Sequence, residues 1–194
     1  MFKQLILARL EGMERDLGYD MSYLKFVLDA DFGAFWRFGK LTGVSQYRRD
    51  VPVAVSYPVA VSYAAKLVGT MAEDCGPCTQ LIVTMAEREQ VPAETLRAVL
   101  HCDDAALDED VRLAVRFSRA VLARDPEADT LREQVLARWG KRGLVSLGFA
   151  LVASRVFPTL KYALGYGRAC IRVTVAGAPV AVQHTSTLAQ SAVT

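Results

Sequence analysis

The chain has 194 residues, of which 52% are apolar, and its formal net charge is only +2. This length predicts a single domain, and the apolar excess predicts a large core or a buried subunit interface. The small net charge and the scattered arginines and lysines form no basic stripe, which argues against nucleic acid as a partner.

No segment predicts a membrane span or a targeting sequence. Residues 1–10 contain some apolar side chains, but Lys3 and Arg9 interrupt them and no small-residue cleavage site follows. The apolar regions 51–72 and 143–164 are interrupted by prolines and charged residues, so neither supplies about 20 consecutive apolar residues. Four cysteines, most of them far apart, do not form the pattern of a disulfide framework and suit a reducing compartment. We therefore expect a cytoplasmic protein with no membrane partner.

Two helices are expected before residue 31. Apolar residues recur at helical spacing over residues 2–17, and Gly18 is expected to end that helix. Asp20 or Ser22 is expected to cap a second, short helix.

A cluster of aromatic residues follows: Phe32, Phe35, Trp36 and Phe38. We expect these side chains to pack in a core or an interface rather than to line a ligand pocket.

The sequence Pro-Val-Ala-Val-Ser-Tyr occurs twice in succession, at residues 52–57 and 58–63. Its alternating valines, taken alone, favour a strand, and two copies are too few for a repeat architecture. Residues 64–68 continue with helical character. We therefore expect the second copy to start a helix, with Pro58 in its first turn.

The most informative stretch places Cys75 and Cys78 two residues apart at the start of an expected helix. Asp74 is a suitable N-cap, and Pro77 falls in the first turn, where its missing N–H costs nothing. Apolar residues on the same face as Cys78 follow: Leu81, Ile82, Met85 and Ala86. The N-terminal end of such a helix favours a thiolate. A thiolate attacks a peroxide or a disulfide, and the neighbouring cysteine then closes a disulfide.

Further helices are expected over residues 93–100, 107–124, 127–139 and about 141–164. Gly140 is expected to end the third of these, and a kink is expected in the last near Pro158. Alternation over 171–175 and 178–182 predicts short strands, and the final residues are expected to be disordered. We expect one helical domain over residues 1–168, followed by a C-terminal tail or arm over residues 169–194.

The tetrapeptide Cys75-Gly76-Pro77-Cys78 also occurs at the active site of thioredoxin-like proteins. Those proteins need a strand ahead of the motif and a βαβ context. The surroundings of this motif have helical patterns almost throughout. The expected fold class is therefore all-α, a helical bundle with an irregular or short-strand C-terminal tail.

Over about residues 58–165 the chain resembles the alkylhydroperoxidase AhpD-like, or carboxymuconolactone decarboxylase, family. The similar features are a small-residue helix before Cys75-x-x-Cys78, an apolar helix after it, the connection at 91–96, and the acidic helix start at 107–109. The resemblance implies an AhpD-like helical fold, a homo-oligomer, and reduction of hydroperoxides without a cofactor. A protein or small-molecule dithiol would restore the enzyme. It also implies that Cys78 attacks the peroxide and Cys75 resolves, whereas the helix dipole favours Cys75 as the more acidic thiol.

The chain departs from that family at both positions of its proton relay. The family has a histidine four residues after the second cysteine, where this chain has Ile82. It has a glutamate twelve residues before the first cysteine, where this chain has Tyr63. Tyr63 and Glu73 are the candidate supporting residues, although a carboxylate beside a thiolate raises the thiol pKa, so Glu73 could only accept a proton. A capping or solvated role is expected for Glu73 and Asp74.

Three alternatives stand beside the redox enzyme. A zinc site of Cys75, Cys78, His101 and Cys102 would need an irregular turn, because adjacent helical residues point about 100° apart, and no metal is expected. A lyase of the decarboxylase branch would need the missing acid–base histidine. A non-catalytic helical oligomer, acting as a binding or structural module, is favoured by the loss of both relay residues. The enzyme requires accessible cysteines with Cα atoms within about 7 Å.

Overall fold

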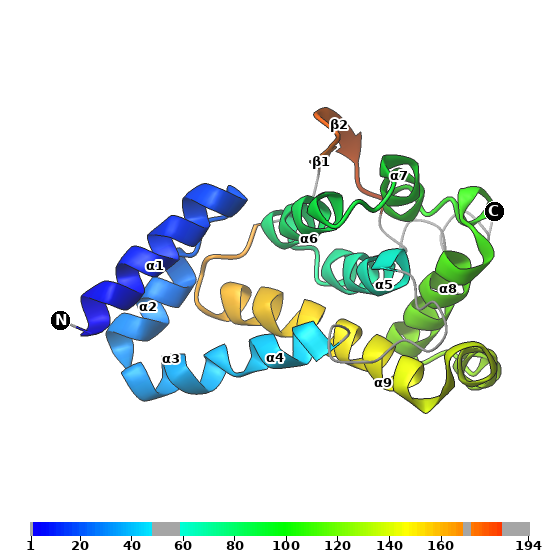
Figure 1. Ribbon diagram of the computed structural model, residues 1–194, viewed down its shortest axis with the longest axis horizontal. Coiled ribbons are helices and arrows are strands. Elements are labelled where there is room, and N and C mark those ends of the chain that lie inside the picture. The colour runs from blue at the N-terminus through cyan, green and yellow to red at the C-terminus, as the bar shows by residue number, and fades with distance from the viewer. Residues whose placement is uncertain (1, 48–58, 169–171, 184–194) are drawn as a thin grey trace.

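The computed structural model of the chain describes residues 2–47, 59–168 and 172–183. These residues are mostly helical, with one small sheet near the C-terminus, which confirms the all-α prediction (Figure 1). The helices are α1 (Phe2–Leu17), α2 (Ser22–Ala30), α3 (Phe32–Gly39), α4 (Leu41–Gln46), α5 (Val59–Ala72), α6 (Gly76–Arg88), α7 (Ala93–Leu100), α8 (Glu109–Ala123) and α9 (Glu127–Ala163). A short 3-10 helix, η2, spans Asp104–Ala106, and the strands are β1 (Arg172–Val175) and β2 (Ala178–Ala181).

Helix α5 lies at the centre of the larger part of the fold. Every residue from Val61 to Met71 is buried, because α6, α8 and α9 all pack against this helix. A helix that is apolar on all sides is stable only when it is enclosed in this way. Its start at Val59 confirms that the second copy of the six-residue sequence begins a helix. Pro58 and the first copy lie outside the described residues.

Helices α1, α2 and α3 form a second unit at one end of the molecule, and α4 leads from it along α9 (Figure 1). Its apolar cluster is built on Leu10, Tyr19, Met21, Tyr23 and Leu28, and side chains from the end of α9 pack against it. Helix α1 ends as predicted at Gly18, whose φ of +60° is a conformation that glycine adopts without steric cost. The connection from α1 to α2 therefore places Tyr19 inside the fold.

The cap of α2 differs from the prediction. The cap position is held by Met21, whose side chain makes no capping hydrogen bond, and the helix begins at Ser22. Asp20 lies one residue further out, and its carboxylate accepts the backbone N–H of Ser22 at 2.8 Å. The carboxylate thus satisfies a donor at the helix start without occupying the cap position.

The aromatic cluster divides into two pairs. Phe35 and Phe38 pack against the cluster of the N-terminal unit, and Phe38 also makes an edge contact with Phe157 of α9. Phe32 and Trp36 are 43% and 56% exposed. Phe35 and Phe38 therefore have the core-packing role that was expected for the cluster.

Helix α9 consists of two helical segments that meet at Gly140. This residue has φ +67° and ψ −173°, which interrupts the helix after Trp139 as predicted. The kink near Pro158 stays a prediction. By length and composition, α9 is the one helix in the described ranges that could cross a membrane, and 44% of its most apolar window is buried inside the protein. It packs along α5 and α8, as a core helix does (Figure 1).

The C-terminal strands form an antiparallel hairpin that packs on α6 and α7 (Figure 1). Val173 pairs with Val180, and both side chains belong to the main core. The Gln80 amide of α6 donates to the Thr174 carbonyl at 3.0 Å and accepts the Thr174 N–H at 2.6 Å. The two predicted strands are confirmed, and this part of the tail folds onto its own chain. Residues 184–194 lie outside the described residues.

We expect Gln80→Ala to loosen the hairpin without unfolding the helices. The variant loses two hydrogen bonds to the β1 backbone, each worth roughly 0.5–1.5 kcal/mol net, so the free energy of opening the hairpin should fall by about 1–3 kcal/mol. Amide hydrogen exchange over 172–181 measures this opening. The exposed Gln134 of α9 supplies a control, since Gln134→Ala should leave this exchange unchanged. Unaltered hairpin exchange in Gln80→Ala would contradict the prediction.

Candidate functional site

Cys75 and Cys78 lie at the start of α6, as predicted, but the cap of this helix is Cys75 rather than Asp74. Asp74 has φ +48° in the turn that leaves α5, and its carbonyl accepts the Tyr162 hydroxyl at 2.7 Å. This turn moves Asp74 outside the cap position, so the prediction that it caps the helix is wrong. Pro77 is in the first turn of the helix, as expected.

The two cysteines are joined in a disulfide, with their Cα atoms 5.3 Å apart. The distance condition for a redox-active pair is therefore met. Both residues are buried, because Cys75 is 0% exposed and Cys78 is 4% exposed. A reactant can reach them only through an internal space or by local opening.

Such a space exists beside Cys78. A cavity of about 240 Å³ lies between the N-terminal helices, α5, α6 and α9, and Cys78 is one of its lining residues. Apolar side chains provide most of the wall: Met13, Leu17, Met21, Leu24, Leu81, Ile82, Met85 and Phe157. Cys75 is not part of this wall. The cavity therefore places Cys78 within reach of a small, largely apolar molecule.

Tyr63 and Ile82, the residues at the two relay positions, both line this cavity. The Tyr63 hydroxyl donates to the Glu89 carboxylate at 2.8 Å, and Glu89 also lines the cavity. Glu89 was not singled out from the sequence, where it appears as one of several polar residues near the end of a helix. The structure thus places a carboxylate in the cavity. This carboxylate belongs to Glu89 at the far end of α6, and not to the position of the family's relay glutamate, where this chain has Tyr63.

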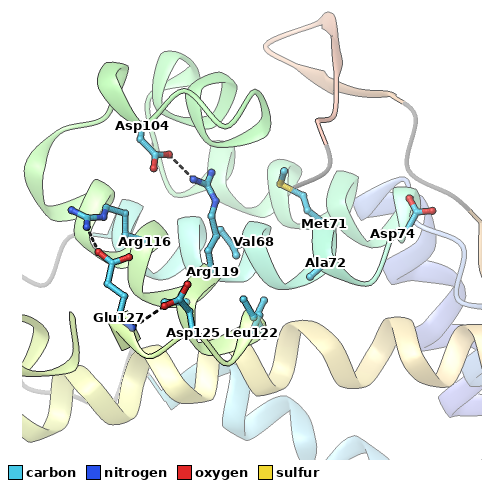
Figure 2. Close-up of a pocket in the computed structure, with 12 residues that line it drawn as sticks. Val68, Met71, Ala72, Asp74, Asp104, Arg116, Arg119, Leu122, Asp125 and Glu127 are labelled. Carbon is cyan, nitrogen blue, oxygen red and sulfur yellow. Dashed lines mark hydrogen bonds and ion pairs between the residues drawn. The ribbon is translucent and has the colours of Figure 1, made fainter. Parts of the chain in front are cut away.

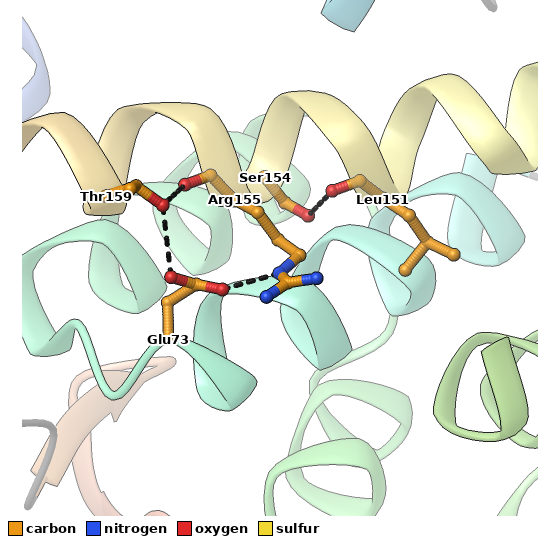
Figure 3. Close-up of polar contacts among 5 residues, drawn as sticks. All are labelled: Glu73, Leu151, Ser154, Arg155 and Thr159. Carbon is orange, nitrogen blue, oxygen red and sulfur yellow. Dashed lines mark hydrogen bonds and ion pairs between the residues drawn. The ribbon is translucent and has the colours of Figure 1, made fainter. Parts of the chain in front are cut away.

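Glu73 is held by α9 (Figure 3). One of its carboxylate oxygens pairs with the Arg155 guanidinium, and the other accepts the Thr159 hydroxyl at 3.1 Å. The side chain is 16% exposed. The expected capping or solvated role is therefore wrong for Glu73. Its partner Arg155 is 82 positions away, and no local pattern predicts such a contact. Asp74 is exposed, as expected of a solvated residue.

Two buried polar residues that sequence reasoning missed lie next to Cys78. The Tyr19 hydroxyl is 3.8 Å from Cys78 Sγ, and Lys161 Nζ is 3.3 Å from the same hydroxyl. Burial raises the pKa of Tyr19 to about 12, so this hydroxyl keeps its proton at neutral pH. Burial also lowers the pKa of Lys161, which Asp20 partly opposes. No local pattern in the sequence connects residues 19, 78 and 161.

The residues considered for a zinc site are placed differently. His101 is exposed at the end of α7, and the Cys102 thiol lies 3.9 Å from the Gln183 carbonyl. Within the described ranges, no three His, Cys, Asp or Glu side chains gather in a group that could hold a metal ion. Cys170 and His184 lie outside those ranges.

A larger open cleft of about 730 Å³ lies along α5 and α8 (Figure 2). Four of its charged side chains form two ion pairs, Asp104 with Arg119 and Arg116 with Glu127. Among the described residues that line it there is no cysteine, histidine, serine or threonine that could act as a nucleophile. The cavity at Cys78 is therefore the better candidate site.

Comparison with protein-family models, with curated proteins and with solved structures finds no match to this chain. The resemblance to the AhpD-like family accordingly rests on the residues quoted above, and the candidate site rests on its own geometry.

Proposed function

We propose that the protein is a thiol-dependent oxidoreductase that reduces hydroperoxides through Cys75 and Cys78. The observation that carries this proposal is a pair of bridged cysteines at a helix start, with Cys78 opening onto an apolar cavity. A buried hydroxyl 3.8 Å from the same sulfur, and a buried amine 3.3 Å from that hydroxyl, support it, because groups of this kind favour the thiolate over the thiol.

The reaction proceeds in two steps from the reduced pair. The Cys78 thiolate attacks one oxygen of the O–O bond, which breaks to give Cys78 sulfenic acid and an alkoxide that takes a proton to become the alcohol. Cys75 then attacks Cys78 Sγ, the disulfide forms and water leaves. A dithiol reductant restores both thiols by disulfide exchange and is itself oxidised.

The cavity favours small organic hydroperoxides as substrates. Its volume of about 240 Å³ and its apolar wall suit a compact hydrocarbon group with the hydroperoxide directed at Cys78. A protein reductant would need the fold to open locally, since both cysteines are buried. A small dithiol could enter through the cavity itself.

A homo-oligomer in the cytoplasm, with no nucleic-acid or membrane partner, remains part of the proposal. Exposed apolar side chains support self-association: Phe2 and Leu5 of α1 are 62% and 67% exposed, and Trp36 of α3 is 56% exposed. These residues line one groove of about 550 Å³ between the two helices. Exposed aromatic and aliphatic groups gathered in this way are typical of interaction surfaces.

The test is the reaction of the reduced protein with cumene hydroperoxide. Cys102→Ser and Cys170→Ser provide a background in which only the motif cysteines react. We expect one equivalent of peroxide to consume two thiols, with a mass loss of two hydrogens and a disulfide between Cys75 and Cys78. Iodoacetamide alkylation against pH should show a thiol that titrates well below its reference pKa of about 8.5. Slow alkylation at every pH with no peroxide-driven bridge would refute the proposal.

The burial of both cysteines favours one rival, a non-catalytic helical module with inert thiols. The same experiment separates the two, because inert thiols would react with peroxide no faster than a small-molecule thiol. The two proposals also differ in the effect of cumyl alcohol, the product of cumene hydroperoxide. The enzyme should bind it in the cavity and show a higher melting temperature, whereas the rival predicts no binding and no change.

A further inference from the structure

Tyr19, Cys78 and Lys161 come from three separate parts of the chain and meet inside the fold. Tyr19 lies in the connection between α1 and α2, Cys78 in the first turn of α6, and Lys161 in the last turn of α9. Their exposed fractions are 5%, 4% and 1%. The hydroxyl of Tyr19 stands between the other two, 3.8 Å from the sulfur and 3.3 Å from the amine nitrogen.

We propose that Tyr19 and Lys161 form a buried relay that stabilises the Cys78 thiolate, with Lys161 Nζ donating to Tyr19 Oη and Tyr19 Oη donating to Cys78 Sγ. The inference rests on the proposed function, because it concerns how the same nucleophile is formed. Tyr19 touches the reacting sulfur and is a catalytic residue in this scheme. Lys161 acts through Tyr19 and is a positioning residue.

The proton balance of this relay is neutral overall. The Cys78 thiol gives its proton to Tyr19 Oη while the proton of Tyr19 passes to the neutral Lys161 amine, which leaves a thiolate and an ammonium. Burial lowers the pKa of Lys161, a change in the direction that this transfer needs, and Asp20 partly opposes it. When the thiolate attacks the peroxide, the reverse movement returns a proton toward the alkoxide that leaves. The ionised pair formed in this way shares one dry environment, where opposite charges attract strongly.

The environment of Lys161 is consistent with a role toward an anion. Within the described part of the chain, Lys161 has no salt bridge, and its nitrogen lies 4.4 Å from the Tyr19 ring centre and 5.2 Å from that of Tyr23. Aromatic faces stabilise an ammonium but do not neutralise it. A thiolate at Cys78 would add a negative charge on the far side of the Tyr19 hydroxyl, besides that of Asp20.

Other titratable groups face the same space and bear on the test. Tyr23 lies on α2, and Asp20 and Arg168 act electrostatically on Lys161. The remaining ones line the cavity from α5 and the end of α6: Tyr63, Lys66 and Glu89. Lys66 donates to the Ser45 carbonyl at 3.1 Å. It is thus a second buried lysine of the same cavity with a different partner, and it serves as a matched control.

The experiment measures the pKa of Cys78 alone, in a background of Cys75→Ser, Cys102→Ser and Cys170→Ser. Thiolate absorbance and alkylation rate are followed against pH. We expect Tyr19→Phe and Lys161→Met each to raise the pKa of Cys78 by about 1 or more, with an alkylation rate at neutral pH about tenfold lower. The double variant should differ little from Lys161→Met, because both substitutions break one relay. Lys66→Met should leave the pKa of Cys78 nearly unchanged.

An unchanged pKa of Cys78 in Tyr19→Phe, with a native circular dichroism spectrum, would overturn the relay. That variant keeps the ring and its packing, so it decides the question even if Lys161→Met fails to fold. An equal rise of the Cys78 pKa in Lys66→Met would also overturn the relay, because the total charge of the cavity would then explain the shift. If wild type forms the peroxide-driven bridge while these variants have no effect, only the relay fails. If the variants raise the pKa but wild type does not bridge, only the peroxidase function fails.

Discussion

Cys78→Ser is expected to abolish the reaction with hydroperoxide, and Cys75→Ser is expected to stop it at a sulfenic acid. Cys78 lines the cavity and its sulfur contacts the Tyr19 hydroxyl, whereas Cys75 is fully buried and does not line the cavity. Removing a nucleophile typically lowers the rate by about 10³-fold or more. Cys75→Ser should retain the first step, so Cys78 sulfenic acid should accumulate and react with dimedone.

The dimedone adduct, located by mass spectrometry, distinguishes the two assignments. Cys102→Ser serves as the control. Burial raises the pKa of the Cys102 thiol, so this thiol should contribute little to the reaction with hydroperoxide and the variant should react as fast as wild type. An adduct on Cys75 in the Cys78→Ser variant, with none in Cys75→Ser, would show that the helix dipole outweighs access through the cavity. The assignment of the nucleophile would then be reversed.

Gly69→Ala is expected to destabilise the fold by about 1–3 kcal/mol. An added Cβ would lie 1.9 Å from Ser154 Oγ and 3.0 Å from Ser154 Cβ, so α5 and α9 would have to separate or Ser154 would have to change rotamer. Ser154 Oγ donates to the Leu151 carbonyl at 2.8 Å, which resists that change (Figure 3). Chemical denaturation followed by circular dichroism measures the loss.

Two further variants test whether the close contact at Gly69 causes the loss of stability. Gly148→Ala on α9 has no heavy atom within 4 Å of the new Cβ, so it should stabilise by roughly 0.5–1 kcal/mol through helix propensity. Ser154→Ala combined with Gly69→Ala removes the shortest contact and should recover part of the loss, measured as a coupling free energy. If Gly69→Ala and Gly148→Ala had equal effects, close approach at Gly69 would not be the cause.

Local sequence chemistry determined most of the secondary structure. Gly18 and Gly140 end helices because their positive φ values suit a residue without a Cβ, and both stops were predicted. The alternating residues after 171 predicted two strands, and the hairpin confirms them. The dithiol at a helix start was also predicted, because proline and the apolar spacing that follows are local signals.

Tertiary structure alone decided which groups surround Cys78. Tyr19 and Lys161 are 59 and 83 positions away from it in sequence, and the fold brings Tyr19 to Cys78 and Lys161 to Tyr19. A capping or solvated role was expected for Glu73, yet Arg155 and Thr159 hold it on α9. The sequence favoured Asp74 as a cap, yet the turn after α5 gives that place to Cys75. Helix periodicity is set by neighbours three or four residues apart. The surroundings of a buried sulfur are set by whichever helices exclude water together, and that depends on the whole chain.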